Sequence, residues 1–245
     1  MSEQGRSKFP EKTPQEYLLE EEELSSNSER RTPITVCIDC SFSMLQQRRL
    51  ERVMEGLADF CRDMAVDPIA SQSVELCIVS FGGEGAFVEQ DFTAPDRIQL
   101  PRLRASGETP LADAVMTALA NLDMRKRRYA DNGNSYFRPW LIVIGDGDET
   151  QSAAELEKAA AVLKAEYENK RLSVLCVTVG DKDHMECDSL MKLSPERKVH
   201  YLRDLKFREF FNWLSRSIQK TTLSMSGEEV FYDPTTTWGE ILGQS

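Results

Sequence analysis

The 245-residue sequence predicts an α/β fold in which a doubly wound, mostly parallel central sheet carries helices on both faces. Two observations predict this fold. Short apolar runs without strict polar alternation recur along the chain, as is typical of strands buried on both faces. Stretches with apolar residues at helical spacing separate these runs, and such alternation favours parallel strands joined by crossover helices.

The expected strands cover residues 34–38, 74–81, 86–88, 140–144, 172–179 and 199–202. The run at 34–38 is rich in β-branched residues, which favour strands. The run at 140–144 is almost continuously apolar. Both runs are followed within two residues by an acidic residue, Asp39 or Asp146. Doubly wound sheets bind ligands beyond the carboxyl ends of their strands, so the residues after the strands are the candidates for a site.

The expected helices lie between these strands. Apolar residues recur at helical spacing over about 50–64, 111–122, 156–167 and 207–218, with a shorter helix near Leu190. Thr109 and Pro110 form a start signal, with the threonine as N-cap and the proline at the first helical position. We therefore expect the helix over 111–122 to begin at Pro110.

The patterned region, residues 32–222, is long enough for one domain of ordinary size. Residues 1–31 are polar and acidic and predict a flexible leader with a helical turn around residues 17–19. Residues 223–245 form a C-terminal tail whose apolar residues, among them Trp238, are candidates for docking on the domain. No apolar run approaches the roughly 20 residues of a membrane span, and the first residues do not resemble a secretory signal. We expect a cytoplasmic protein without a membrane partner.

Charge and cysteine usage narrow the function classes. The net charge of −11 disfavours a nucleic-acid partner, because the polyphosphate is repelled. The basic run at 125–128 follows a helical pattern and is interpreted as a solvated helix end, with an anion-binding patch as the alternative. Cys37 and Cys40 are expected on opposite faces of a strand and so are unsuited to joint zinc binding. All six cysteines are expected to be reduced.

Three polar clusters stand at the positions where ligands are expected. One follows the first strand as Asp-Cys-Ser-Phe-Ser, one is a threonine at a helix start, and one follows the strand at 140–144 as Asp-Gly-Asp. The oxygen donors that they supply are Asp39, Ser41, Ser43, Thr109 and Asp146. Carboxylates and hydroxyls suit hard cations such as Mg²⁺ or Ca²⁺. Neutral hydroxyl ligands leave the cation short of negative charge, so a carboxylate from another protein is a fitting additional ligand.

These clusters, in this order, resemble the metal-ion-dependent adhesion site (MIDAS) of von Willebrand factor A (vWA) domains. The resemblance covers residues 34–219. It implies that the two serines bind the ion, with Thr109, Asp39 and Asp146 binding directly or through water. It also implies Mg²⁺, with Ca²⁺ or Mn²⁺ as alternatives, and a partner protein that supplies an Asp or Glu. Two positions depart from the common pattern: Phe42 stands where many members have Gly, and Gly145 where a Thr is frequent.

Within that superfamily, three segments resemble the bacterial TerY-like group linked to tellurite resistance. They are residues 107–114, 138–140 and 207–214. This resemblance implies a stress-response or defence system with kinase and phosphatase partners. It also implies a binding module without catalytic residues rather than an enzyme.

Two alternatives stay open. Residues 146–150 read Asp-x-Asp-x-Thr after an apolar strand and resemble the nucleophile motif of haloacid dehalogenase-type phosphatases. In that reading Asp146 attacks phosphorus, Asp148 is the general acid and base, and Mg²⁺ neutralises charge. Over a hundred patterned residues precede Asp146, and the reading leaves the serines unexplained. The second alternative is a scaffold that binds partners through its leader or tail and holds only a structural metal.

Overall fold

The computed structural model describes residues 6–146, 153–179, 187–223 and 239–243. In this part of the chain a seven-stranded sheet has the order β3-β2-β1-β4-β5-β6-β7. The strands are β1 (Thr32–Asp39), β2 (Val74–Gly82), β3 (Gly85–Thr93), β4 (Trp140–Gly145), β5 (Ser173–Thr178), β6 (Lys198–Leu202) and β7 (Gly239–Gly243). The five inner strands run parallel, and β3 and β7 are antiparallel edges. The predicted α/β class is confirmed. The edge strand β7 is an element that the sequence pattern does not predict.

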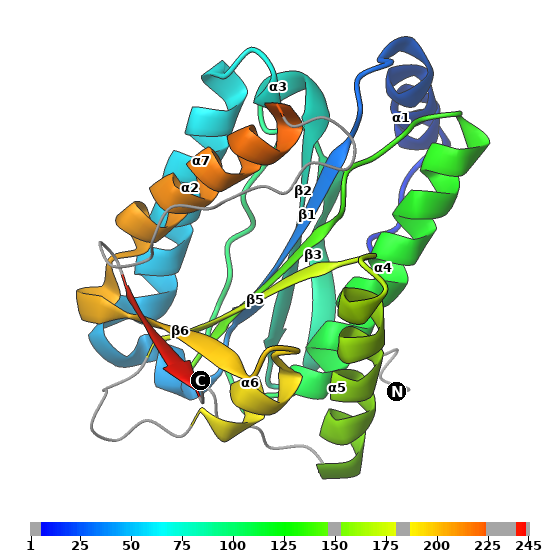
Figure 1. Ribbon diagram of the computed structural model, residues 1–245. Helices are drawn as coiled ribbons and strands as arrows, with labels where there is room; N and C mark the ends of the chain where they lie inside the picture. Colours follow the sequence, from blue (N-terminus) through cyan, green and yellow to red (C-terminus); the bar gives the residue numbers. More distant parts are fainter. Residues whose placement is uncertain (1–5, 147–152, 180–186, 224–238, 244–245) are drawn as a thin grey trace.

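Helices cover both faces of the sheet (Figure 1). One face carries α2 (Arg49–Val66), α3 (Ala70–Ser73) and α7 (Phe207–Leu223), and the other carries α4 (Leu111–Asp131), α5 (Ala153–Glu168) and α6 (Asp188–Leu193). Two short 3₁₀ segments, η1 (Phe42–Arg48) and η3 (Arg203–Leu205), complete the connections. The helix after Thr109 begins at Leu111, one residue later than the Thr-Pro signal predicts. No helix in the described ranges has the length and apolar character needed to cross a bilayer.

The core is divided by the sheet into two apolar layers. Ile34, Val36 and Ile38 of β1 pack in the layer beneath α2 and α7, whereas Cys37 packs in the layer beneath α4 and α5. Strand alternation explains this division, because successive side chains point to opposite faces. Cys40 lies in the layer opposite to Cys37, so the two thiols do not converge, as predicted.

The switch point of the sheet lies between β1 and β4. The chain builds β2 and β3 on one side of β1 and then crosses to build β4, β5 and β6 on the other side. Ile38 pairs with Ile144, so Asp39 and Gly145 follow at adjacent positions on the two strands. The carboxyl ends of β1 and β4 therefore form the crevice in which doubly wound folds bind ligands, at the lower edge of the sheet in Figure 1.

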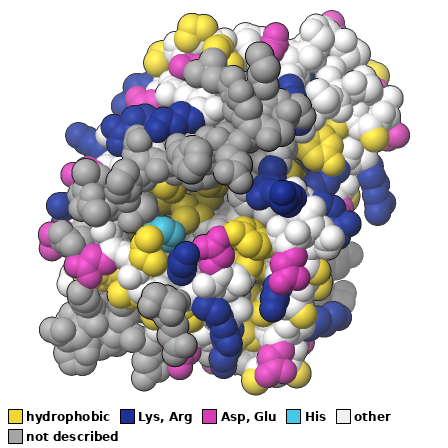
Figure 2. Space-filling model, in the orientation of Figure 1, with side chains coloured by type: hydrophobic (Ala, Val, Ile, Leu, Met, Phe, Trp, Pro, Cys, Tyr) yellow, Lys and Arg dark blue, Asp and Glu magenta, His cyan; other side chains and the backbone are white. Residues whose placement is uncertain are grey.

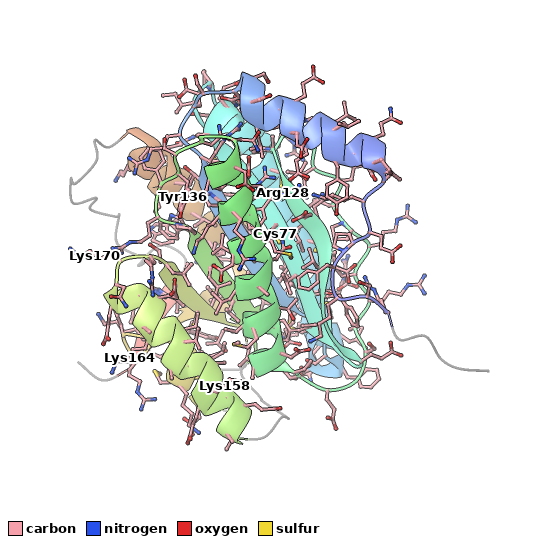
Figure 3. The ribbon with its side chains drawn as sticks, turned by 90° about the vertical axis from the view of Figure 1, so that its right-hand side faces the viewer. Cys77, Arg128, Tyr136, Lys158, Lys164 and Lys170 are labelled. Carbon is pink, nitrogen blue, oxygen red and sulfur yellow. The ribbon has the colours of Figure 1, made fainter. Side chains whose placement is uncertain are left out.

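The leader is more ordered than predicted, because the expected helical turn around residues 17–19 is part of a longer helix. Helix α1 (Pro14–Ser26) begins with a capping box between Thr13 and Glu16. Its Glu20 side chain is 10 % exposed and forms ion pairs with Lys12, Arg125 and Arg128. Figure 3 shows α1 lying across the upper end of α4, close to the labelled Arg128. This packing differs from the flexible leader that the polar composition predicts.

The basic run in α4 also differs from its interpretation as a solvated helix end. Arg125 is 3 % exposed and pairs with Glu20 and with Glu75 of β2. Tyr129 is buried beside it and donates to the same Glu75 carboxylate. Arg125 and Arg128 of the run therefore bind carboxylates of the chain itself, because α1 supplies Glu20 at the position where solvent was expected, whereas Arg127 is exposed.

Candidate metal centre

The loop after β1, residues 39–43, forms one side of the candidate centre and is called the metal loop below. The Ser41 backbone N–H donates to Asp39 Oδ1 over 2.7 Å, which turns the loop back toward its own strand. The Ser41 and Ser43 hydroxyl oxygens are 2.8 Å apart. This spacing shows that the i, i+2 pattern brings both hydroxyls to one side of the loop. Asp39 and Ser41 are buried, and Ser43 is partly exposed.

Asp146, directly after β4, forms the opposite side. Burial and the negative charge of the neighbouring Asp146 carboxylate together raise the pKa of Asp39 to about 7. The hydrogen bonds from Ser41 lower this pKa and offset part of the rise. The two carboxylates are therefore close enough to interact. Gly145 permits this proximity: a Cβ at that position would lie 2.9 Å from Asp39 Oδ2. In this chain the glycine thus leaves space for the Asp39 carboxylate.

Thr109 approaches from a third segment. Residues 106–108 lie against the metal loop through two backbone hydrogen bonds, from Ser106 N–H to the Cys40 carbonyl over 2.6 Å and from Phe42 N–H to the Gly107 carbonyl over 3.3 Å. Thr109 follows this contact and is 5 % exposed. The three predicted clusters therefore come from neighbouring segments at one edge of the sheet.

Arg49 is a member of the site that sequence reasoning missed. Its guanidinium Nη1 lies 3.7 Å from Asp146 Oδ2 and donates to the Ser43 carbonyl over 3.4 Å. Gln47 and Arg48 have left-handed backbone angles, with φ of 50° and 56°, and they turn the chain into α2 so that Arg49 is buried. Residues other than glycine ordinarily avoid positive φ, so no local sequence pattern predicts this turn.

The residues present fit a hard divalent cation. Asp39 Oδ2 and Asp146 Oδ1 are buried and accept no hydrogen bond from the described part of the chain. Buried carboxylate oxygens without donors are costly unless a cation compensates them. The hydroxyls of Ser41 and Ser43 stand beside them, so carboxylate and hydroxyl oxygens are available together. No group of three or more His, Cys, Asp or Glu side chains suited to a metal occurs in the described ranges, so this centre depends on hydroxyls.

The second acid of the phosphatase-like motif, Asp148, lies outside the described residues, as do the later acidic segment at 180–183 and Trp238 of the tail. The structure does bear on the topology of that motif. Asp146 follows β4, which pairs with the earlier strand β1 in the middle of the sheet. It does not follow the first strand of the domain, where the resemblance requires the nucleophile.

Comparisons with known proteins rest on structure alone. No protein-family model matches the sequence, and no curated protein matches it. Proximal thread matrix protein 1 of the mussel byssus aligns with a TM-score of 0.56 at 16 % identity, covering 79 % of this chain and 49 % of that one. The vWF domain of the Porphyromonas gingivalis pilus tip protein Mfa5 aligns with a TM-score of 0.56 at 11 % identity, covering 82 % and 99 %. The SpRpn10 VWA domain aligns with a TM-score of 0.50 at 12 % identity, covering 74 % and 94 %.

Two further facts qualify these similarities. This chain spans about half of the mussel protein, and about a third of the pilus adhesin SpaC, which aligns with a TM-score of 0.58. The mussel protein also has a structure in which zinc occupies its MIDAS motif. The identities lie far below the range in which function follows from similarity, whereas the TM-scores of 0.56 and 0.58 show that the fold is shared. The chain has the fold of a von Willebrand factor A domain.

Proposed function

We propose that the protein is a non-enzymatic, metal-dependent protein-binding module. Asp39, Ser41, Ser43, Thr109 and Asp146 hold one divalent cation, Mg²⁺ in preference to Ca²⁺ or Mn²⁺, and a partner's Asp or Glu completes its coordination. One observation carries this proposal: two buried carboxylate oxygens without donors lie beside two hydroxyls at the switch point of the sheet. The zinc-occupied MIDAS of the mussel neighbour agrees with it.

Exposed apolar side chains beside the centre favour a protein as the partner. Phe42 is 62 % exposed and stands between the two serines, and Leu45 is 57 % exposed one turn later. Large apolar side chains at the surface, close to polar anchoring groups, are typical of protein interfaces. They have no evident use in a site for a small phosphoester.

The proposal also covers the biological system and the cellular compartment in which the protein works. The resemblance of residues 107–114, 138–140 and 207–214 to the TerY-like group supports a bacterial tellurite-resistance, stress-response or defence system with a kinase or phosphatase partner. Six free thiols support a reducing compartment, the cytoplasm. The leader is a poor candidate for the alternative scaffold, because its Glu20 and Glu23 form ion pairs within the chain.

The test is co-purification from the native host, with and without a chelator, using wild type, S41A/S43A and a matched control. S25A/S26A is that control, since both serines are exposed at the end of α1 and, among the described residues, their hydroxyls donate to nearby helix carbonyls. Wild type and the control should capture a partner that chelation and S41A/S43A both release. Unchanged capture by S41A/S43A would refute the metal-bridged mode and favour the scaffold. Turnover of a generic phosphoester that is lost in Asp146→Asn would contradict the non-enzymatic assignment.

A further inference from the structure

A hollow of about 550 Å³ lies directly beside the metal loop. Cys40, which stands between Asp39 and Ser41, forms part of its wall. Gly82, at the end of β2, and Ser106, whose N–H donates to the Cys40 carbonyl, form a neighbouring part. The hollow and the candidate metal centre therefore lie at the same edge of the sheet and share the metal loop as a common wall.

Three arginines line this hollow, and two of them are available to a ligand. Arg6 is engaged, with Nη2 2.7 Å from Glu89 Oε2 and its guanidinium 4.3 Å from the centre of the Phe87 ring. Arg102 and Arg104 are exposed. Within the ranges that the structure describes, neither of these two makes an ion pair or a side-chain hydrogen bond.

The segment 101–108 determines where these two arginines stand. Exposure alternates along it, so that Arg102 and Arg104 are exposed while Leu103 and Ala105 pack against the core beneath α2 and α7. This alternation is that of an extended chain with one face anchored. The segment then leads into Thr109, so one stretch of chain holds both the arginines and a proposed metal ligand.

The acidic side chains in the wall of the hollow neutralise the positive charge of the arginines only in part. Glu89 accepts from Arg6 and, over 2.6 Å, from the Ser80 hydroxyl, and the other acid of the wall is the exposed Glu84. Three arginines against two glutamates leave one net positive charge in the hollow, in a chain whose net charge is −11. Since the chain as a whole repels anions, a local positive site beside the metal selects where an acidic ligand can bind.

We propose that the hollow is a second subsite for the same acidic protein segment that binds the metal. One carboxylate of the partner binds the cation, and a further acidic side chain of that segment binds Arg102 and Arg104. A guanidinium suits this task because its planar fork matches a carboxylate with two parallel hydrogen bonds. The inference rests on the proposed function and narrows its partner from a protein with one acidic residue to a protein with an acidic run.

The probe for this subsite is a labelled hexaglutamate peptide, whose binding is followed by fluorescence anisotropy in Mg²⁺ and, separately, in chelator. The variant is R102E/R104E, and it is compared with Arg127→Glu. Arg127 is an exposed arginine without an ion pair in the described structure. It lies near the far end of α4, about 24 Å along the helix from the metal edge. Neither change removes a core contact, so folding is expected to persist.

In Mg²⁺ the R102E/R104E variant should bind hexaglutamate about ten-fold more weakly than wild type, while R127E stays within about two-fold. Mg²⁺ affinity measured by calorimetry should not fall in either variant, because neither removes a ligand of the ion and added negative charge does not weaken cation binding. In chelator, wild type should retain weak, salt-sensitive binding that R102E/R104E removes. This second arm does not use the metal, so it separates failure of the subsite from failure of the metal site. Equal losses in R102E/R104E and R127E, or no arginine-dependent binding in either arm, would overturn the subsite.

Discussion

At the scale of single residues, the candidate centre depends on small differences in space around two carboxylates. Asp39 and Asp146 come from adjacent strands, and the raised pKa of Asp39, to about 7, reflects its burial and then the second negative charge beside it. Arg49 compensates part of that charge from one side, through Asp146. The two oxygens without donors remain on the side where a cation fits, Asp39 Oδ2 and Asp146 Oδ1.

Gly145 gives a direct test of this arrangement. A Cβ there would lie 2.9 Å from Asp39 Oδ2 and 3.2 Å from Asp39 Cβ, so Gly145→Ala forces the carboxylate to move while β4 stays in place. We expect Mg²⁺ affinity to fall by roughly ten-fold or more, the usual cost of disturbing a ligand's support. Gly133→Ala controls for backbone strain without a contact to Asp39: Gly133 has a φ of 71°, so alanine is strained there, but its Cβ meets nothing within 4 Å and Mg²⁺ affinity should stay at the wild-type value. Equal Mg²⁺ affinity in G145A and wild type would show that Asp39 does not bind the ion.

At the scale of elements, the N-terminal helix is part of the domain because its acids meet buried bases. The pKa of Glu20 is raised by burial but lowered more by the charges of Arg125 and Lys12, so the carboxylate stays ionised. Lys8 adds a second anchor: its carbonyl accepts from Val88 N–H over 2.8 Å, beside the edge strand β3. The leader thus covers one edge of the sheet and the end of α4.

Glu20→Gln tests whether α1 is docked in solution. The change removes the charge that Arg125 and Arg128 face, and we expect a loss of about 2 kcal/mol in the free energy of unfolding, measured by urea denaturation. Because the pKa of Glu20 is lowered from 4.5, its stabilisation is fully present above pH 4.5 and shrinks as the pH falls below it. Glu22→Gln, at an exposed position of the same helix, should change little. Identical stabilities for E20Q and E22Q would indicate a flexible leader.

The elements also show what the sequence could and could not predict. Strand periodicity located β1, β2, β4, β5 and β6 because their runs are apolar and their neighbours are helical. The pattern shortened β3, because the residues that follow Val88 in this edge strand are mostly polar and only partly buried, and it missed β7. The sequence pattern did not predict the docking of α1, because ion pairs can hold a polar helix in place and such pairs leave no hydrophobic periodicity in the sequence.

At the scale of the whole molecule, the fold brings together residues that are far apart in the sequence. Asp39, Thr109 and Asp146 come to one edge of the sheet because β1 and β4 are neighbours and the segment before α4 is hydrogen-bonded to the residues that follow β1 and β2. Sequence order predicted this convergence through the switch-point rule. It could not predict Arg49 or the arginine hollow, because their places depend on loop geometry.

The surface of the molecule agrees with selective rather than general anion binding. On the face shown in Figure 2, basic and acidic side chains are interspersed among the described residues instead of forming one basic field. Several arginines and lysines elsewhere pair with acids of the chain itself, as Arg125 and Lys12 do. Arg102 and Arg104 differ from these pairs, because they line the hollow at the edge of the sheet where the metal centre lies and are available to an acidic ligand.

The most direct test of the account is a calorimetric titration of Mg²⁺ into the wild-type protein and into S41A/S43A. We expect one ion per chain in wild type and an affinity lower by about ten-fold or more in the variant, because the two hydroxyls are ligands of the ion. Circular dichroism of both proteins should be the same. Absence of Mg²⁺ binding in wild type, or equal affinity in the two proteins, would contradict a metal centre built on the metal loop.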